Sequence, residues 1–165
     1  MKKIISSVIV LLVMAAGVCN AQASKEEDFM KAFFEALKNN DKKTLKESLM
    51  LKESDLDAYN ESQKNIGSTK VFTKGDFEKF VAEKNDKISR EFDALYKNAL
   101  NSKITFENTK FGSYRKIADP AADVPAGYYR IVFKFHDVYS FKMQLECVPV
   151  GDGLRLYNVL DTVTM

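Results

Sequence analysis

The sequence is poor in the residue types on which disulfide frameworks, metal sites and phosphate-binding loops depend. Its 165 residues include two cysteines, one histidine and seven glycines, and it has no tryptophan. No set of cysteines and histidines with zinc-ligand spacing occurs, and neither a glycine-rich phosphate loop nor a serine nucleophile motif is present. We therefore expect the protein to bind no metal and no cofactor.

The sequence also lacks an apolar run long enough for a transmembrane helix, which needs about 20 residues. An uncharged stretch near the start, Ile4 to Val18, follows two lysines and precedes the small residues Ala21 and Ala23. This order of charged, apolar and small residues is typical of a secretory signal peptide. We predict that residues 1–23 are cleaved off, and that residues 24–165 form a single domain exported to the periplasm or the extracellular space.

Two other interpretations of the N-terminal segment stay open, an uncleaved membrane anchor and a lipoprotein acylated at Cys19. Asn20 and Gln22 end the apolar run, which disfavours the anchor. Val18 disfavours the lipoprotein, because lipoprotein signals usually carry glycine, alanine or serine before the acylated cysteine. Mass spectrometry of the mature N-terminus distinguishes the interpretations, because it identifies either Ser24 or a diacylated Cys19.

The chain has no excess of charge once the predicted leader is removed. Residues 24–165 carry 23 basic and 23 acidic side chains, because the leader takes two lysines and no acidic residue with it. Without net charge there is no electrostatic argument for binding nucleic acid or an anionic membrane, and we expect neither as a partner.

Cleavage would also leave Cys147 as the only cysteine, so the fold cannot rely on an intramolecular disulfide. A lone cysteine could be a nucleophile, a dimer bridge or a small buried hydrophobe. Cys147 continues an alternating apolar pattern, which favours burial. The other members of that pattern are Tyr139, Phe141, Met143 and Leu145.

Apolar residues recur with helical spacing before about residue 101. The pattern predicts a helix over residues 25–39, opened by a capping box of Ser24 and Glu27, and a short helix over residues 41–50 capped by Asp41. Residues 51–72 are less clear and fit a short helix followed by a short strand over 69–72.

A long helix is predicted over residues 73–100, opened by Thr73 and Asp76. Its apolar stripe suits a helix lying on a sheet. Lys84 interrupts this stripe, and we expect its stem to be packed and its ammonium to be in water. The stripe consists of Phe77, Val81, Ile88, Phe92, Leu95 and Ala99.

Beyond residue 103 the spacing changes to the alternation of antiparallel strands. We predict a strand over residues 104–117 with a bulge near Asn108, a loop over Asp119 to Gly127, and three further strands. Tyr129, Ile131, Phe133 and Phe135 are expected inside, and so are Tyr139, Phe141, Met143, Leu145 and Cys147. Tyr128, Arg130, Lys134, His136, Ser140, Lys142, Gln144 and Glu146 are expected outside.

The glycines at 151 and 153 are predicted to allow the positive φ of a turn before the last strand, residues 154–163. The expected fold class is therefore α+β, with the N-terminal helices and one long helix packed on a curved antiparallel sheet of four to five strands, a cystatin-like, cone-shaped roll.

This order of elements resembles the nuclear transport factor 2-like superfamily over nearly all of residues 25–163. The local resemblance lies in Phe29 to Asp41, FMKAFFEALKNND, and in Gly153 to Val159, GLRLYNV. The resemblance implies a cone-shaped cavity between sheet and helices. Relatives use this cavity for isomerase, cyclase or dehydratase chemistry or for binding, so the fold alone does not choose the function.

The inward positions of the strands are apolar or aromatic and include no pair of carboxylates, which disfavours acid–base catalysis in the cavity. His136 beside Asp137 and Asp161 near the end of the last strand are the remaining catalytic candidates. Six rings are the candidate ligand pocket, with plain core packing as the alternative. They are Phe33, Phe92, Tyr129, Phe133, Tyr139 and Phe141.

Three functions follow from these residues. The first is an exported, non-enzymatic module that binds a small apolar ligand or a partner protein. The second is an isomerase-like or hydrolase-like enzyme that uses Asp161 or His136, and the third is an inhibitor or immunity-type protein that acts through residues 119–127. The charged outer positions favour a monomer or a weak homodimer.

Overall fold

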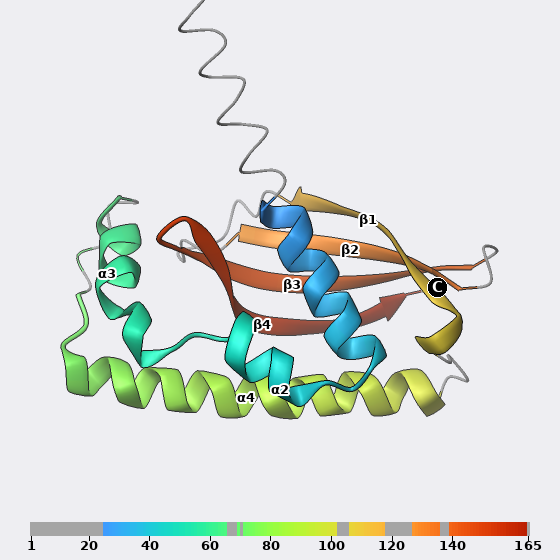
Figure 1. Cartoon of the computed structure of the whole chain (residues 1–165), viewed down its shortest axis with the longest axis horizontal. Helices are drawn as coiled ribbons and strands as arrows, with labels where there is room; N and C mark the ends of the chain where they lie inside the picture. The colour runs from blue at the N-terminus through green and yellow to red at the C-terminus, as the bar shows by residue number, and fades with distance from the viewer. Residues whose placement is uncertain are drawn as a thin grey trace, which may run out of the picture.

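The computed structural model describes residues 25–65, 69, 71–101, 106–117, 127–135 and 139–164 (Figure 1). Helices precede strands, and the α+β class expected from the sequence is confirmed. In chain order the elements are a helix over residues 25–38, α2 (Lys42–Thr44), the π-helical turn η1 (Leu45–Leu49), the 3-10 turn η2 (Glu53–Asp55), α3 (Leu56–Asn65), α4 (Lys74–Asn101), the 3-10 turn η3 (Phe106–Asn108), β1 (Thr109–Ile117), β2 (Gly127–Phe135), β3 (Tyr139–Val150) and β4 (Gly153–Thr164).

The four strands form one antiparallel sheet in the order β1-β2-β3-β4. Two of its irregularities matter for the side-chain pattern. On β1 the register shifts between Phe111 and Ser113, and on β4 the residue Tyr157 is inserted where Glu146 pairs with Asn158 and Cys147 pairs with Leu156. Each inserted residue reverses the alternation of the strand. Two residues on opposite sides of the insertion therefore lie on the same face of the sheet when they are an odd number of positions apart.

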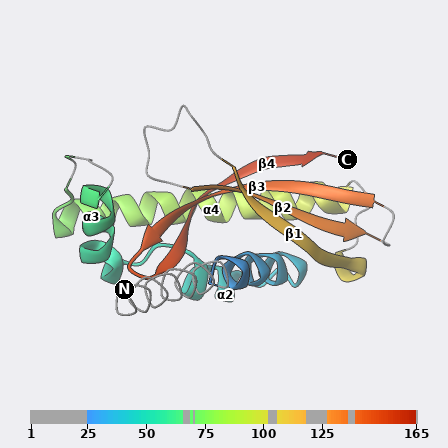
Figure 2. The same ribbon diagram turned by 90° about the horizontal axis from the view of Figure 1, so that it is seen from above.

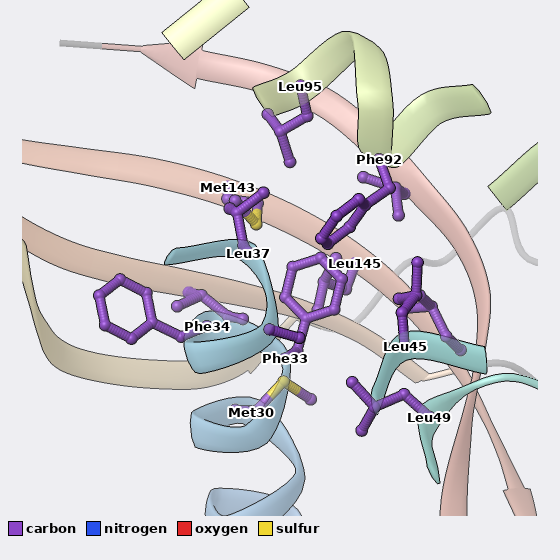
Figure 3. Packing of buried hydrophobic residues seen from close by; sticks show 14 of the residues in the cluster. Met30, Phe33, Phe34, Leu37, Leu45, Leu49, Phe92, Leu95, Met143 and Leu145 are labelled. Atoms are coloured by element: carbon purple, nitrogen blue, oxygen red, sulfur yellow. The ribbon is translucent and has the colours of Figure 1, made fainter. Parts of the chain in front are cut away.

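The first helix covers one face of the sheet, which we call the inner face (Figures 1 and 2). The main core lies between this helix and the sheet, and Figure 3 shows Phe33, Phe92 and Leu145 pointing toward one another there. Phe33, Phe92 and Leu145 are all 0% exposed. Cys147 is also buried in this core as a free thiol, as its strand parity predicts, and burial raises its pKa.

Caps and a left-handed residue set the helix boundaries. The first helix ends at residue 38, and Asn40 adopts a φ of 49°, a left-handed conformation that asparagine tolerates better than most residues. Asp41 caps α2 as predicted, because its carboxylate accepts hydrogen bonds from the backbone N–H groups of Lys43 and Thr44. The hydroxyl of Thr44 also donates to this carboxylate and, as the main cause, lowers its pKa.

Helix α4 crosses the edge of the sheet beside β4, and its two halves therefore pack on different faces. Ile88, Phe92 and Leu95 enter the main core on the inner face, whereas Phe77 and Val81 belong to a second cluster. All six residues of the predicted stripe are buried. The second cluster covers the end of β3 on the opposite face, through Leu51, Tyr59, Val148 and Val150.

Two predictions of strand are wrong. At the described positions 69, 71 and 72 no strand forms, because the backbone N–H and C=O of Phe72 pair with the side chain of Asn60. Phe106 lies in η3 rather than in a strand, and Thr109, whose hydroxyl donates to the carbonyl of Phe106, begins β1.

The predicted bulge near Asn108 lies instead at Gly112, where a Cβ would be 3.0 Å from the carbonyl oxygen of Val132. Of the turn glycines only Gly151 has a positive φ, 58°, and Gly153 already belongs to β4. Ser24 and Ile104 lie outside the described residues.

The pH dependence of stability tests whether Tyr129 is buried in the core. Its hydroxyl donates to a carboxylate oxygen of Glu26 at 2.9 Å, and burial and this bond raise its pKa well above the ordinary value near 10. Because the folded pKa is the higher one, the stabilisation is present below pH 10 and is lost as the pH rises above it. We predict that the free energy of unfolding falls between pH 9 and pH 11, and that Tyr129→Phe removes about 1.4 kcal/mol of this fall in denaturant titrations. Equal falls in the two proteins would contradict the assignment.

Candidate functional site

The rings predicted to line a ligand pocket belong to the main core. Phe33, Phe92, Tyr129, Phe133 and Phe141 are each at most 5% exposed. Phe33 meets Phe92 edge to face at 6.1 Å between ring centroids, and Phe133 stacks on Phe141 at 5.5 Å. Such ring contacts are those of a packed core. Ligand binding by these rings stays a prediction, and the side chain of Tyr139 lies outside what the structure describes.

The structure does not describe the side chains of the predicted catalytic candidates. His136 and Asp137 lie outside the described residues, as do residues 119–126 of the predicted inhibitory loop, and Asp161 is described by its backbone alone. Their proposed roles therefore stay predictions. Within the described ranges no three histidine, cysteine, aspartate or glutamate residues are grouped so as to hold a metal ion, and no helix is long and apolar enough to cross a membrane.

The face of the sheet opposite the first helix carries exposed and half-exposed side chains. The pairing of the strands places three cross-strand rows on it. We call this set the outer face: Lys110, Lys134 and Ser140 in one row, Ser113, Val132 and Lys142 in the next, and Arg115, Arg130, Gln144 and Leu160 in the third. Half of these ten residues are basic and none is acidic.

The basic residues of the outer face include two cross-strand pairs of like charge. Lys110 lies directly opposite Lys134, and Arg115 lies directly opposite Arg130. Opposed side chains on neighbouring strands have Cβ atoms about 4.5–5.5 Å apart, so like charges at such positions destabilise the sheet. The bulge at Gly112 creates this arrangement, because it brings Lys110 and Arg115, five residues apart, onto one face.

Glu146 lies at the boundary between the outer face and the second cluster. Its parity is outward, as predicted, but it is only 4% exposed rather than facing solvent. The burial arises because α3 and the first half of α4 cover this end of the sheet. Among the side chains that the structure describes, the one acidic residue that continues the rows of the outer face is therefore removed from water.

A chain of polar contacts holds Glu146. Its carboxylate accepts a hydrogen bond from the Asn158 amide, whose oxygen accepts one from the Lys87 ammonium at 3.1 Å. Lys87 also pairs with Glu91 at 3.4 Å, and Glu91 accepts the backbone N–H of Val159 on the edge strand at 3.1 Å. These contacts use the carboxylate of Glu146 to fix the sheet edge to α4, which is a structural role.

Lys84 lies where α4 passes the inserted residue of β4. Its ammonium is 3.6 Å from the centroid of the Tyr157 ring, a cation–π contact, and not simply in water as the sequence suggested. Desolvation by its neighbours, followed by the repulsion of Lys87, lowers its pKa. The interruption of the apolar stripe thus marks the crossing point of helix and sheet.

Comparison with known proteins identifies no relative. No family model matches the sequence, no curated protein matches it, and no solved structure matches the fold. The resemblance to the nuclear transport factor 2-like superfamily therefore stays a prediction, and the function has to be argued from the residues themselves.

Proposed function

We propose that residues 24–165 form an exported, non-enzymatic module that binds a partner protein through the outer face. The observation that supports this best is the composition of that face: half-exposed Val132 lies in the middle row, and basic side chains surround it. An apolar centre with a polar rim is the usual anatomy of a protein interface.

The packing of the core and the two edges of the sheet agree with this proposal. The described candidate pocket rings are all buried in the main core, where Phe33 contacts Phe92 and Phe133 contacts Phe141, which gives a small apolar ligand less support than a partner protein. Addition of a partner strand is also disfavoured, because β1 carries a bulge and exposed lysines and arginine along its edge. At the opposite edge of the sheet, on β4, the Glu91 carboxylate already accepts a hydrogen bond from the backbone N–H of Val159. The face of the sheet is thus a better contact surface than its edges.

Site-specific photo-crosslinking in the producing cells tests the proposal. A photoreactive amino acid replaces Lys142, which is exposed on the outer face, or, as a matched control, Lys31, which is exposed on the first helix. We expect a discrete protein adduct from position 142 and none from position 31, because the two lysines lie on opposite sides of the sheet.

The partner identified by mass spectrometry is then purified, and its affinity is measured by calorimetry. We expect Val132→Ser to weaken binding about tenfold, because it removes the apolar centre of the contact. The absence of an adduct at position 142 would contradict the proposal, and stabilisation of the protein by apolar compounds in a thermal-shift screen would then favour the small-ligand alternative.

A further inference from the structure

We infer that the protein bound by the outer face presents clustered aspartate and glutamate side chains to it. This inference rests on the proposed function and names the chemistry of the partner. It is carried by the charge of the face, whose described side chains include five basic residues and no acidic one.

Several basic residues elsewhere in the described chain form ion pairs within the protein. On the helices Lys31 pairs with Glu27 at 2.6 Å, Lys42 pairs with Asp93 at 2.7 Å, and Lys87 pairs with Glu91. Arg155 pairs with Asp55 at 2.9 Å where the outer side of the sheet is covered. Neighbouring carboxylates thus balance part of the positive charge on these surfaces.

Among the described residues, no carboxylate forms an ion pair with Arg115, Arg130, Lys134 or Lys142. The nearest acidic position in the rows, Glu146, is buried and already accepts the Asn158 amide. Arg115 and Arg130, which lie opposite each other on β1 and β2, therefore repel one another in the free protein, and an acidic partner would convert this repulsion into attraction.

Several features favour an acidic protein over other anionic partners. Arg115 and Arg130 present planar guanidinium groups that match carboxylates in paired hydrogen bonds, and arginine is enriched in protein interfaces. Val132 and Leu160 add apolar contact area that a sugar or phosphate backbone does not use. A second copy of the chain is disfavoured, because two outer faces would oppose like charges.

Fluorescence anisotropy with four probes tests the inference on the purified chain. The probes are a glutamate dodecapeptide, the same peptide with leucine at its two central positions, a heparin dodecasaccharide, and vesicles of phosphatidylcholine and phosphatidylglycerol. We expect the leucine-containing acidic peptide to bind tightest and to lose at least tenfold in affinity when salt is raised from 50 to 300 mM. Tighter binding of heparin or of vesicles would overturn the inference.

Two double variants with the same change of net charge locate the binding. Arg115→Gln with Arg130→Gln is expected to weaken the leucine-containing peptide at least tenfold, whereas Lys31→Gln with Lys97→Gln is expected to change its affinity less than threefold. Equal losses in the two variants would overturn the inference. The arginine variant should melt at or above the temperature of the parent, because the repulsion between opposed arginines is removed, and a lower melting temperature would contradict that repulsion.

The two proposals can fail separately. A photo-adduct at position 142 whose formation is insensitive to 300 mM salt would leave the proposed function standing and would overturn the acidic partner. Absence of any adduct at position 142 would contradict the proposed function, whatever the peptides show.

Discussion

Phe33→Ala is expected to lower the free energy of unfolding by about 3–5 kcal/mol, the range for deletion of a fully buried aromatic ring. Phe33 is 0% exposed, lies at the centre of the main core and meets Phe92 edge to face. Its removal deletes contacts with both the sheet side and the α4 side of the core (Figure 3). Because small domains are stable by only about 5–15 kcal/mol, the variant should be close to unfolded at 37 °C.

Denaturant titration measures this effect, with two controls. Phe33→Leu keeps most of the volume and should cost less than about 2 kcal/mol. Leu100→Ala removes a side chain that is 49% exposed and should change stability by no more than about 0.5 kcal/mol. A cost below about 1 kcal/mol for Phe33→Ala would mean that the ring is not part of a packed core.

Asp55→Ala is expected to cost about 2–3 kcal/mol through loss of an ion pair that is largely removed from water. The Arg155 Nε donates to Asp55 at 2.9 Å, and the two side chains are 23% and 10% exposed. Asp55 also accepts the backbone N–H of Lys52 at 3.0 Å, so its loss frees the start of η2 as well. Breaking such a pair leaves one charge uncompensated, and the partial exposure of Arg155 places the cost below that of a fully buried pair.

A double-mutant cycle isolates the pair from the rest of the site. Asp55→Ala combined with Arg155→Met should be less destabilising than the sum of the single variants by about 1–2 kcal/mol. Asp152→Ala breaks the exposed pair between Asp152 and Lys25 and should have a much smaller effect, because water screens an exposed ion pair. Strict additivity of Asp55→Ala and Arg155→Met would contradict a direct coupling.

The elements that local chemistry determines could be predicted from the sequence. Asp41 caps α2, Thr73 precedes α4, and Cys147 is buried. Each of these features is indicated by the neighbours of that residue in the sequence. In each case the signal lies within a few residues, as a capping side chain or an alternating pattern. The long apolar stripe of α4 was predictable for the same reason.

The features that depend on tertiary packing could not be predicted. Glu146 alternates with buried residues and should face water, yet α3 and α4 cover it. The strand expected at residues 69–72 does not form at the described positions 69, 71 and 72, because Asn60, twelve residues before Phe72, supplies the hydrogen bonds of the Phe72 backbone. Neither contact leaves a periodic signal in the sequence.

The basic cluster of the outer face was only partly predictable. Arg130, Lys134 and Lys142 are outward positions of a plain alternation, but Lys110 and Arg115 have opposite parity and join them only through the bulge at Gly112. A balanced net charge conceals such a cluster, because it sums over all faces of the molecule. The register of the sheet was the missing information.

The reactivity of a thiol placed on the outer face tests the central claim most directly. Ser140→Cys lies on the outer face, Ser54→Cys is an exposed control near the covered end of the sheet, and the native Cys147 is buried. The labelling rate of each variant by a maleimide is measured in the purified chain and in the producing cells, and the two rates are compared. For each position we divide the rate in cells by the rate in the purified chain. We predict that this ratio is at least tenfold smaller at position 140 than at position 54, because the partner covers the outer face in cells. Equal ratios at the two positions would show that the outer face is free in its native setting and would contradict the claim.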